Sequence, residues 1–277
     1  MEAIIQLINS YFHEPYASLL NGMVVGKKLH TTKLFYDQIK TAGLLHLVVL
    51  SGMNISLLTA ILMNTLAGLF HRKIATIITI CVIVGFIYAV GAEPPIIRAG
   101  IMGILALTAT FFGRNTLALY SLFLSAIIML LVHFEWLYTI SFQLSFGATL
   151  GIILFGNISS ERKEKQKKEK NMVKKYITDV VKYFREELRI SLAAQIFTLP
   201  LIFIYFREIS LVAPLANILV GWTVAPITII GIIVIFIGLI SWKIGFVLSW
   251  LLYPMLWWMV LVIGNVSKIP FGFLRLY

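Results

Sequence analysis

The residues that could carry chemistry first appear in the stretch HLVVLSGMN, residues 46–54, at the start of an apolar run. A histidine and a serine, His46 and Ser51, are the base and nucleophile types of many hydrolases. However, Val and Leu precede the serine instead of the glycine-rich approach of a strained nucleophile, and no other histidine lies within a span that could pair with it. We therefore assign no catalytic residue. We expect His46, Ser51, Gly52 and Asn54 to shape a polar interior, because such residues at membrane depth face protein or water.

A second group of chemically distinctive residues lies in EPPIIR, residues 93–98, where one apolar span ends and another begins. Pro94 restricts the turn and suits the first turn of a helix. Arg98 then lies near one end of that helix, and burying it in a bilayer costs about 2.5–3.5 kcal/mol unless it gains a partner or water. Glu93 and Gln143 are the candidate partners, and an arginine that reaches the membrane surface is the alternative.

Uncharged polar residues recur inside the later apolar spans. These are Gln143 and Ser145 in FQLSFGATLG, Gln195 in AAQIFTLP and Asn217 in PLANILVG. Each one alone is expected to join helices by hydrogen bonds, whereas together they could line an interior without fixed acids. The five histidines are scattered and Cys81 is the single cysteine, so the sequence predicts no metal site, no disulfide and no cofactor.

The elements that position these residues are membrane helices. Of the 277 residues, 60% are hydrophobic and 13% are charged, about half the charged fraction of a soluble domain. Long stretches lack Lys, Arg, Asp and Glu altogether, and several reach the roughly 20 residues that cross a bilayer. They are 42–70, 74–91, 99–112, 117–134, 137–156, 190–205, 209–240 and 244–264. The predicted fold is an all-α, polytopic transmembrane bundle with interrupted or re-entrant helices and amphipathic interfacial helices.

Four regions follow from the pattern of charge and hydropathy. Residues 1–41 form an interfacial amphipathic segment or a marginal first span, residues 42–156 a first transmembrane half, and residues 190–277 a second one. Between the halves, residues 157–189 hold 11 Lys/Arg against 6 acids. They predict a basic amphipathic helix on the cytoplasmic surface, or a solvated helical linker.

Two apolar segments carry interrupting residues, one in each half of the chain. Residues 42–58 contain the polar cluster described above. Residues 209–240 hold Pro214, Asn217 and Pro226, and their length predicts a short broken or re-entrant piece, residues 209–226, followed by a full span. Paired interruptions of this kind indicate a central site in transport proteins.

Four blocks of the sequence resemble the signatures of the ComEC competence family. They are HLVVLSGMNISLL, EPPIIRAGIMGILALTATFFGRN, LYTISFQLSFGATLGIILF and SLAAQIFTLPLIFIYFREISLVAPLANILV, in the family's order. The family usually has His where this chain has Asn54. Members typically also carry an OB-like domain and a nuclease domain, and the HxHxDH motif of the latter is absent from these 277 residues.

The resemblance implies a plasma (inner) membrane channel for single-stranded DNA, not an enzyme. Its implied partners are single-stranded DNA, the lipid membrane, a separate cytoplasmic ATPase and a DNA receptor, with further copies of the chain as an additional candidate. A small-molecule or lipid-related permease on the same scaffold, a membrane enzyme, and a fragment completed by neighbouring chains stay open as alternatives. The candidate path residues are His46, Ser51, Gly52, Asn54, Glu93, Pro94, Arg98, Gln143, Ser145, Gln195 and Asn217.

Overall fold

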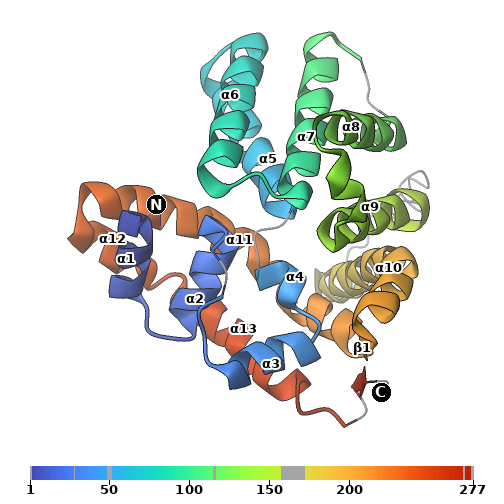
Figure 1. The fold of residues 1–277 in the computed structure, drawn as a ribbon. Helices are drawn as coiled ribbons and strands as arrows, with labels where there is room; N and C mark the ends of the chain where they lie inside the picture. The colour runs from blue at the N-terminus through green and yellow to red at the C-terminus, as the bar shows by residue number, and fades with distance from the viewer. Residues whose placement is uncertain are drawn as a thin grey trace.

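The computed structural model describes residues 2–27, 29–48, 52–114, 117–156, 172–270 and 272–275. Nearly all of them are helical (Figure 1). Ser51 and residues 157–171, the most basic part of the predicted linker, lie outside the described residues.

Helices α5 to α10 form one side of the molecule (Figure 1). Their bounds are α5 Gly52–Leu69, α6 Arg72–Val90, α7 Pro94–Phe111, α8 Ala118–Val132, α9 Ile140–Gly151 and α10 Met172–Phe206. A 3₁₀ turn, η2 (Phe134–Tyr138), precedes α9, and a π-helical turn, η3 (Ile152–Gly156), follows it. A small core of Ile55, Ile83, Ile96, Ala99 and Leu107 holds α5, α6 and α7 together.

The other side combines the two ends of the chain. It contains α1 (Glu2–Tyr11), α2 (Tyr16–Leu20), the π-helical turn η1 (Asn21–Val25), α3 (Lys33–Thr41) and α4 (Leu45–Val48). Against them pack α11 (Ala213–Ile240), α12 (Trp242–Ser249) and α13 (Tyr253–Val266), and the larger hydrophobic core is shared between the two groups. The N-terminal and C-terminal segments, far apart in sequence, thus form one body.

The N-terminal segment is more deeply packed than an interfacial helix would be. Every residue from Ala17 to Val25 is buried. Asn21 Nδ2 donates to Asn9 Oδ1 at 2.9 Å, and Ser18 Oγ donates to the His30 carbonyl at 2.6 Å. These hydrogen bonds offset part of the cost of burying the polar side chains.

Five described helices are long and apolar enough to cross a membrane: Gly52–Leu69, Arg72–Val90, Pro94–Phe111, Phe184–Phe206 and Ala213–Ile240. The pair α12 and α13, bent by 47° at a short break, provides up to one more. Many large apolar side chains point outward, as they do on surfaces that lipid covers. The protein is therefore an all-α membrane protein, as the sequence predicts.

The prediction of a broken segment at 209–226 is wrong, because α11 runs unbroken from Ala213 to Ile240. Pro214 lies in its first turn, where a proline has no helical hydrogen bond to lose. Pro226 lies inside the helix, and the surrounding packing keeps the helix continuous: twelve residues of α11 are buried. The break instead falls between α12 and α13.

A short antiparallel sheet joins the end of α10 to the segment after α13. Strand β1 (Glu208–Ser210) pairs with β2 (Phe273–Arg275), with Ile209 opposite Leu274. The Leu211 amide extends the pairing by donating to the Gly272 carbonyl at 2.8 Å. This sheet holds the two ends of the second transmembrane half together.

Candidate functional site

The first residue of α5 lies directly against Arg98 of α7. Gly52 is buried, and a Cβ atom added to it would lie 2.5 Å from Arg98 Nη2 and 3.0 Å from Ala99 Cβ. A side chain at this position would collide with the guanidinium group. Gly52 is thus a close-approach position that lets the arginine lie between two helices.

Arg98 also joins α7 to α9. Its Nη1 atom donates a hydrogen bond to Thr149 Oγ1, and Thr149 Oγ1 donates to the Ser145 carbonyl at 2.9 Å. The Nε atom of Arg98 is buried and has no hydrogen-bond partner among the described residues. Three helices, α5, α7 and α9, therefore meet at one guanidinium group.

Glu93 does not neutralise this arginine. Its exposed side chain stands at the N-cap of α7 without a capping hydrogen bond, and Pro94 follows it in the first turn. Lys40 forms an ion pair with Glu208, and no ion pair of the described residues reaches Arg98. Among the described residues, the guanidinium therefore has no carboxylate partner.

Ser145 and Gln143 lie on α9, close in sequence to Thr149. Ser145 Oγ is buried and has no hydrogen-bond partner among the described residues, so it is available to a ligand or water. Gln143 is already engaged: its Nε2 donates to the Leu137 carbonyl at 3.0 Å, and Tyr205 Oη donates to its Oε1 at 3.0 Å. Gln143 therefore ties α9 to α10 and is not the partner of Arg98.

A second polar group joins α10 to α11. Asn217 Nδ2 donates to Ser191 Oγ at 3.0 Å, while Asn217 Oδ1 is buried without a partner in the described chain. Gln195 lies one turn after Ser191 and is half-buried. The Glu187 carboxylate lies one turn before Ser191, 3.7 Å from where a Cβ of Gly221 would be. The second group thus contains an acid, unlike the group around Arg98.

The two polar groups are linked by the contact between α9 and α10. Gly151 of α9 is buried against the backbone carbonyl of Ala193, and Gly147 faces Phe197. Ala193 stands between Ser191 and Gln195 in sequence. Small residues at i and i+4 let α9 and α10 approach closely. Because α10 also packs against α11, it lies between α9 and α11.

Asn54 and His46 lie apart from these groups. Asn54 is buried, with its Nδ2 donating to the Met23 carbonyl at 2.7 Å and its Oδ1 accepting from Thr228 Oγ1 at 3.5 Å. It braces α5 against η1 and α11. His46 is exposed on the four-residue helix α4.

The residues that sequence reasoning missed are Thr149 and Ser191. Both are hydroxyl residues one helical turn from polar positions that it did identify, Ser145 and Gln195. That spacing places them on the same helix face and could have signalled their role. Among the described residues no cluster of His, Cys, Asp and Glu could hold a metal ion.

The fold and these contacts define a polytopic membrane protein whose helices meet through two polar groups, one around Arg98 and one that contains Glu187. The chain belongs to the Competence protein family, whose model matches residues 23–276. It is similar to ComE operon protein 3 of Bacillus subtilis (strain 168), 25% identical over 218 residues, which is 78% of this chain and 26% of that protein. The chain thus spans about a quarter of the length of this curated relative. No solved structure matches it significantly.

Family membership confirms the resemblance carried by the four sequence blocks.

Proposed function

We propose that the protein is a channel for single-stranded DNA in the plasma membrane, used during natural transformation. The observation that carries the proposal is Arg98, a guanidinium held where α5, α7 and α9 meet and paired with no carboxylate among the residues that the structure describes. An unpaired arginine in a span is costly, so it indicates a function in which an anion passes or binds. The phosphates of a nucleic acid are such anions, and guanidinium is their common partner.

The neighbours of Arg98 suit a passing polyanion. Ser145 Oγ has no hydrogen-bond partner among the described residues, so its hydroxyl is free to donate to a phosphate oxygen, while Thr149 Oγ1 accepts from the guanidinium and orients it. Helices α5 to α9 contain no Asp or Glu that would repel a phosphate. The nearest described acid by sequence, Glu93, lies exposed before α7.

The protein is proposed to work with other components. A DNA receptor would deliver the strand and a cytoplasmic ATPase would draw it inward, because these 277 residues contain no phosphate-binding P-loop. The chain itself is proposed to act as a channel without catalysis, and association of several copies is one arrangement of such a channel.

The decisive experiment measures uptake of labelled transforming DNA in a deletion strain that expresses Arg98→Ala, Arg98→Lys or wild-type protein at equal membrane levels. Arg98→Ala should reduce uptake at least about tenfold, and Arg98→Lys should restore part of it because a positive charge returns without the planar fork. Lys243→Ala, which removes an exposed cation on α12, is the matched control and should leave uptake unchanged.

Purified protein in liposomes separates a DNA channel from a small-molecule permease. A DNA channel should pass short single-stranded oligonucleotides, with binding that weakens as salt rises by a slope of about −0.7 per phosphate contacted. Liposomes that pass anionic metabolites but retain oligonucleotides would contradict the proposal, as would normal DNA uptake in the deletion strain.

A further inference from the structure

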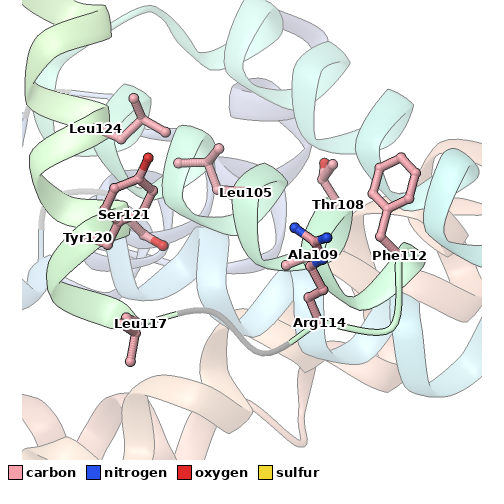
Figure 2. A pocket seen from close by; sticks show the side chains of 9 residues that line it. All are labelled: Leu105, Thr108, Ala109, Phe112, Arg114, Leu117, Tyr120, Ser121 and Leu124. Carbon is pink, nitrogen blue, oxygen red and sulfur yellow. The ribbon is translucent and has the colours of Figure 1, made fainter.

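A groove lies between α7 and α8, away from Arg98. Figure 2 shows side chains of α7 on one wall, side chains of α8 on the other and Arg114 in the connection between the helices. Its volume is about 660 Å³, within the range of roughly 300–1,000 Å³ typical of ligand sites. The lining residues are Leu105, Thr108, Ala109, Phe112, Arg114, Leu117, Tyr120, Ser121 and Leu124.

The lining is apolar along its length and carries one charge. Phe112, Leu117 and Tyr120 are 70%, 76% and 68% exposed. Exposing such large apolar side chains to water is unfavourable in free energy, so lipid or another apolar partner would cover them at lower cost. No acidic residue contributes to the lining. Arg114 is exposed at the end of the groove where α7 stops, so the groove has an apolar body and a cationic end.

More positive charge gathers at the same end. Helices α6 and α7 pack as neighbours joined by a short link, so the start of α6 lies beside the end of α7. The Lys73 Nζ atom lies 5.5 Å from the centroid of the Phe111 ring, which confirms this placement. Arg72, Lys73 and Arg114 are all exposed there.

The cationic end falls at the surface of the membrane. α7 is a membrane-length helix of 18 residues that ends at Phe111, so Arg114 lies beyond the hydrocarbon and at the level of the lipid headgroups. Lys and Arg at this level attract anionic headgroups, whereas the apolar wall between α7 and α8 lies at the depth of acyl chains.

We propose that this groove binds one anionic phospholipid. Its acyl chain lies along the apolar walls of α7 and α8, and its phosphate contacts Arg114 and Lys73. A nucleic acid fits less well, because a single-strand site needs cations that follow the backbone, and here they gather at one end. The site is independent of Arg98 and of the proposed DNA path.

The test is native mass spectrometry of the full chain after exchange into vesicles of phosphatidylglycerol or phosphatidylcholine. The wild-type protein should retain phosphatidylglycerol in preference to phosphatidylcholine. Arg114→Ala and Lys73→Ala should each lower retention of phosphatidylglycerol about fivefold, the loss expected for one cation at a membrane surface. Lys243→Ala, which removes another exposed cation, should not change it.

A second variant tests the apolar part of the site. Ala109→Trp fills the groove and leaves both cations in place, so it should lower retention of both lipids, with circular dichroism showing an unchanged helix content.

Equal retention of the two lipids, or unchanged retention in Arg114→Ala, would overturn the proposal. So would a single-stranded oligonucleotide that displaces the bound lipid in wild-type protein but not in Arg114→Ala, because the groove would then be a nucleic-acid site. None of these outcomes changes what Arg98→Ala does to DNA uptake.

Discussion

The Nδ2 atom of Asn54, near the start of α5, donates a 2.7 Å hydrogen bond to the backbone carbonyl of Met23 in η1. The bond joins residues 31 positions apart and lies fully inside the protein. Thr228 of α11 donates to the other end of the same amide at 3.5 Å. One side chain thus links the three elements at the junction of the two sides of the molecule.

Replacing Asn54 with Leu should destabilise this junction. The Met23 carbonyl would be left buried without its partner, which costs about 1–3 kcal/mol. Thermal unfolding in detergent, followed by circular dichroism, measures the loss. The matched control is Thr59→Val on the same helix, because the Thr59 hydroxyl bonds only the Ile55 carbonyl of its own turn. Equal melting temperatures for both variants would show that the hydrogen bonds of Asn54 to Met23 and Thr228 do not contribute to stability.

The close contact between α9 and α10 gives a prediction about two glycines four residues apart. A Cβ atom on Gly151 would clash with the Ala193 carbonyl, which is backbone and cannot rotate away. A Cβ atom on Gly147 would meet Phe197 Cβ at 3.4 Å, an ordinary contact. Gly151→Ala should therefore lower the free energy of unfolding by about 1–3 kcal/mol. Gly147→Ala should leave it nearly unchanged.

The same pair of variants also reports on function. If the polar group on α10 depends on the position of this helix, Gly151→Ala should reduce DNA uptake more than Gly147→Ala at equal membrane levels. The measurement is the unfolding midpoint together with uptake of labelled DNA. Comparable destabilisation by both substitutions would contradict the close approach of α9 and α10.

Much of the fold could be predicted from composition and hydropathy. Runs without charge indicate membrane helices because burying a charge in hydrocarbon is costly. Each run can therefore be recognised from its own residues, without knowing what it contacts. The start of α7 could also be predicted from the sequence, since Pro94 suits a first helical turn and Arg98 follows one turn later. Local rules therefore located the arginine of the candidate site.

Contacts between residues far apart in the sequence determine the features that local sequence patterns did not predict. Pro226 predicted a break, yet α11 continues through it, because its buried packing outweighs one lost hydrogen bond. The hydrogen bonds of Asn54 could not be predicted either, because its partners Met23 and Thr228 come from distant parts of the chain. Neither the pairing of Arg98 with Thr149 nor the merging of the two chain ends leaves a periodic signal in sequence.

A glycine in the link before α4 gives the third prediction. Gly43 has φ +71°, and a Cβ there would also clash with Ala213 Cβ. Gly113, in the link after α7, has a similar φ of +68° but open space around it. Gly113→Ala should cost about 1–2 kcal/mol, the penalty of a left-handed backbone for an L-residue. Gly43→Ala should cost more, because packing strain adds to the same backbone penalty. A smaller loss for Gly43→Ala in thermal unfolding would show that the α3–α4 link moves aside.

The ion pair of Lys40 and Glu208 gives the last prediction. It joins the end of α3 to β1, and beside it Ser210 Oγ donates to the Thr41 carbonyl at 2.7 Å. The Glu208 side chain is buried, whereas that of Lys40 is 38% exposed. Lys40→Met should therefore lower the free energy of unfolding, by about 1–3 kcal/mol, because it removes a cation from beside a buried carboxylate.

Adding Glu208→Gln to Lys40→Met should restore part of that stability, since the buried side chain that lost this cation is then neutral. A double-mutant cycle in thermal or denaturant unfolding measures the coupling between the two side chains. Lys33→Met is the matched control, because Lys33 is exposed at the start of the same helix. If the two substitutions are additive, the ion pair does not hold β1 to α3, and the Ser210–Thr41 hydrogen bond is then the contact that does.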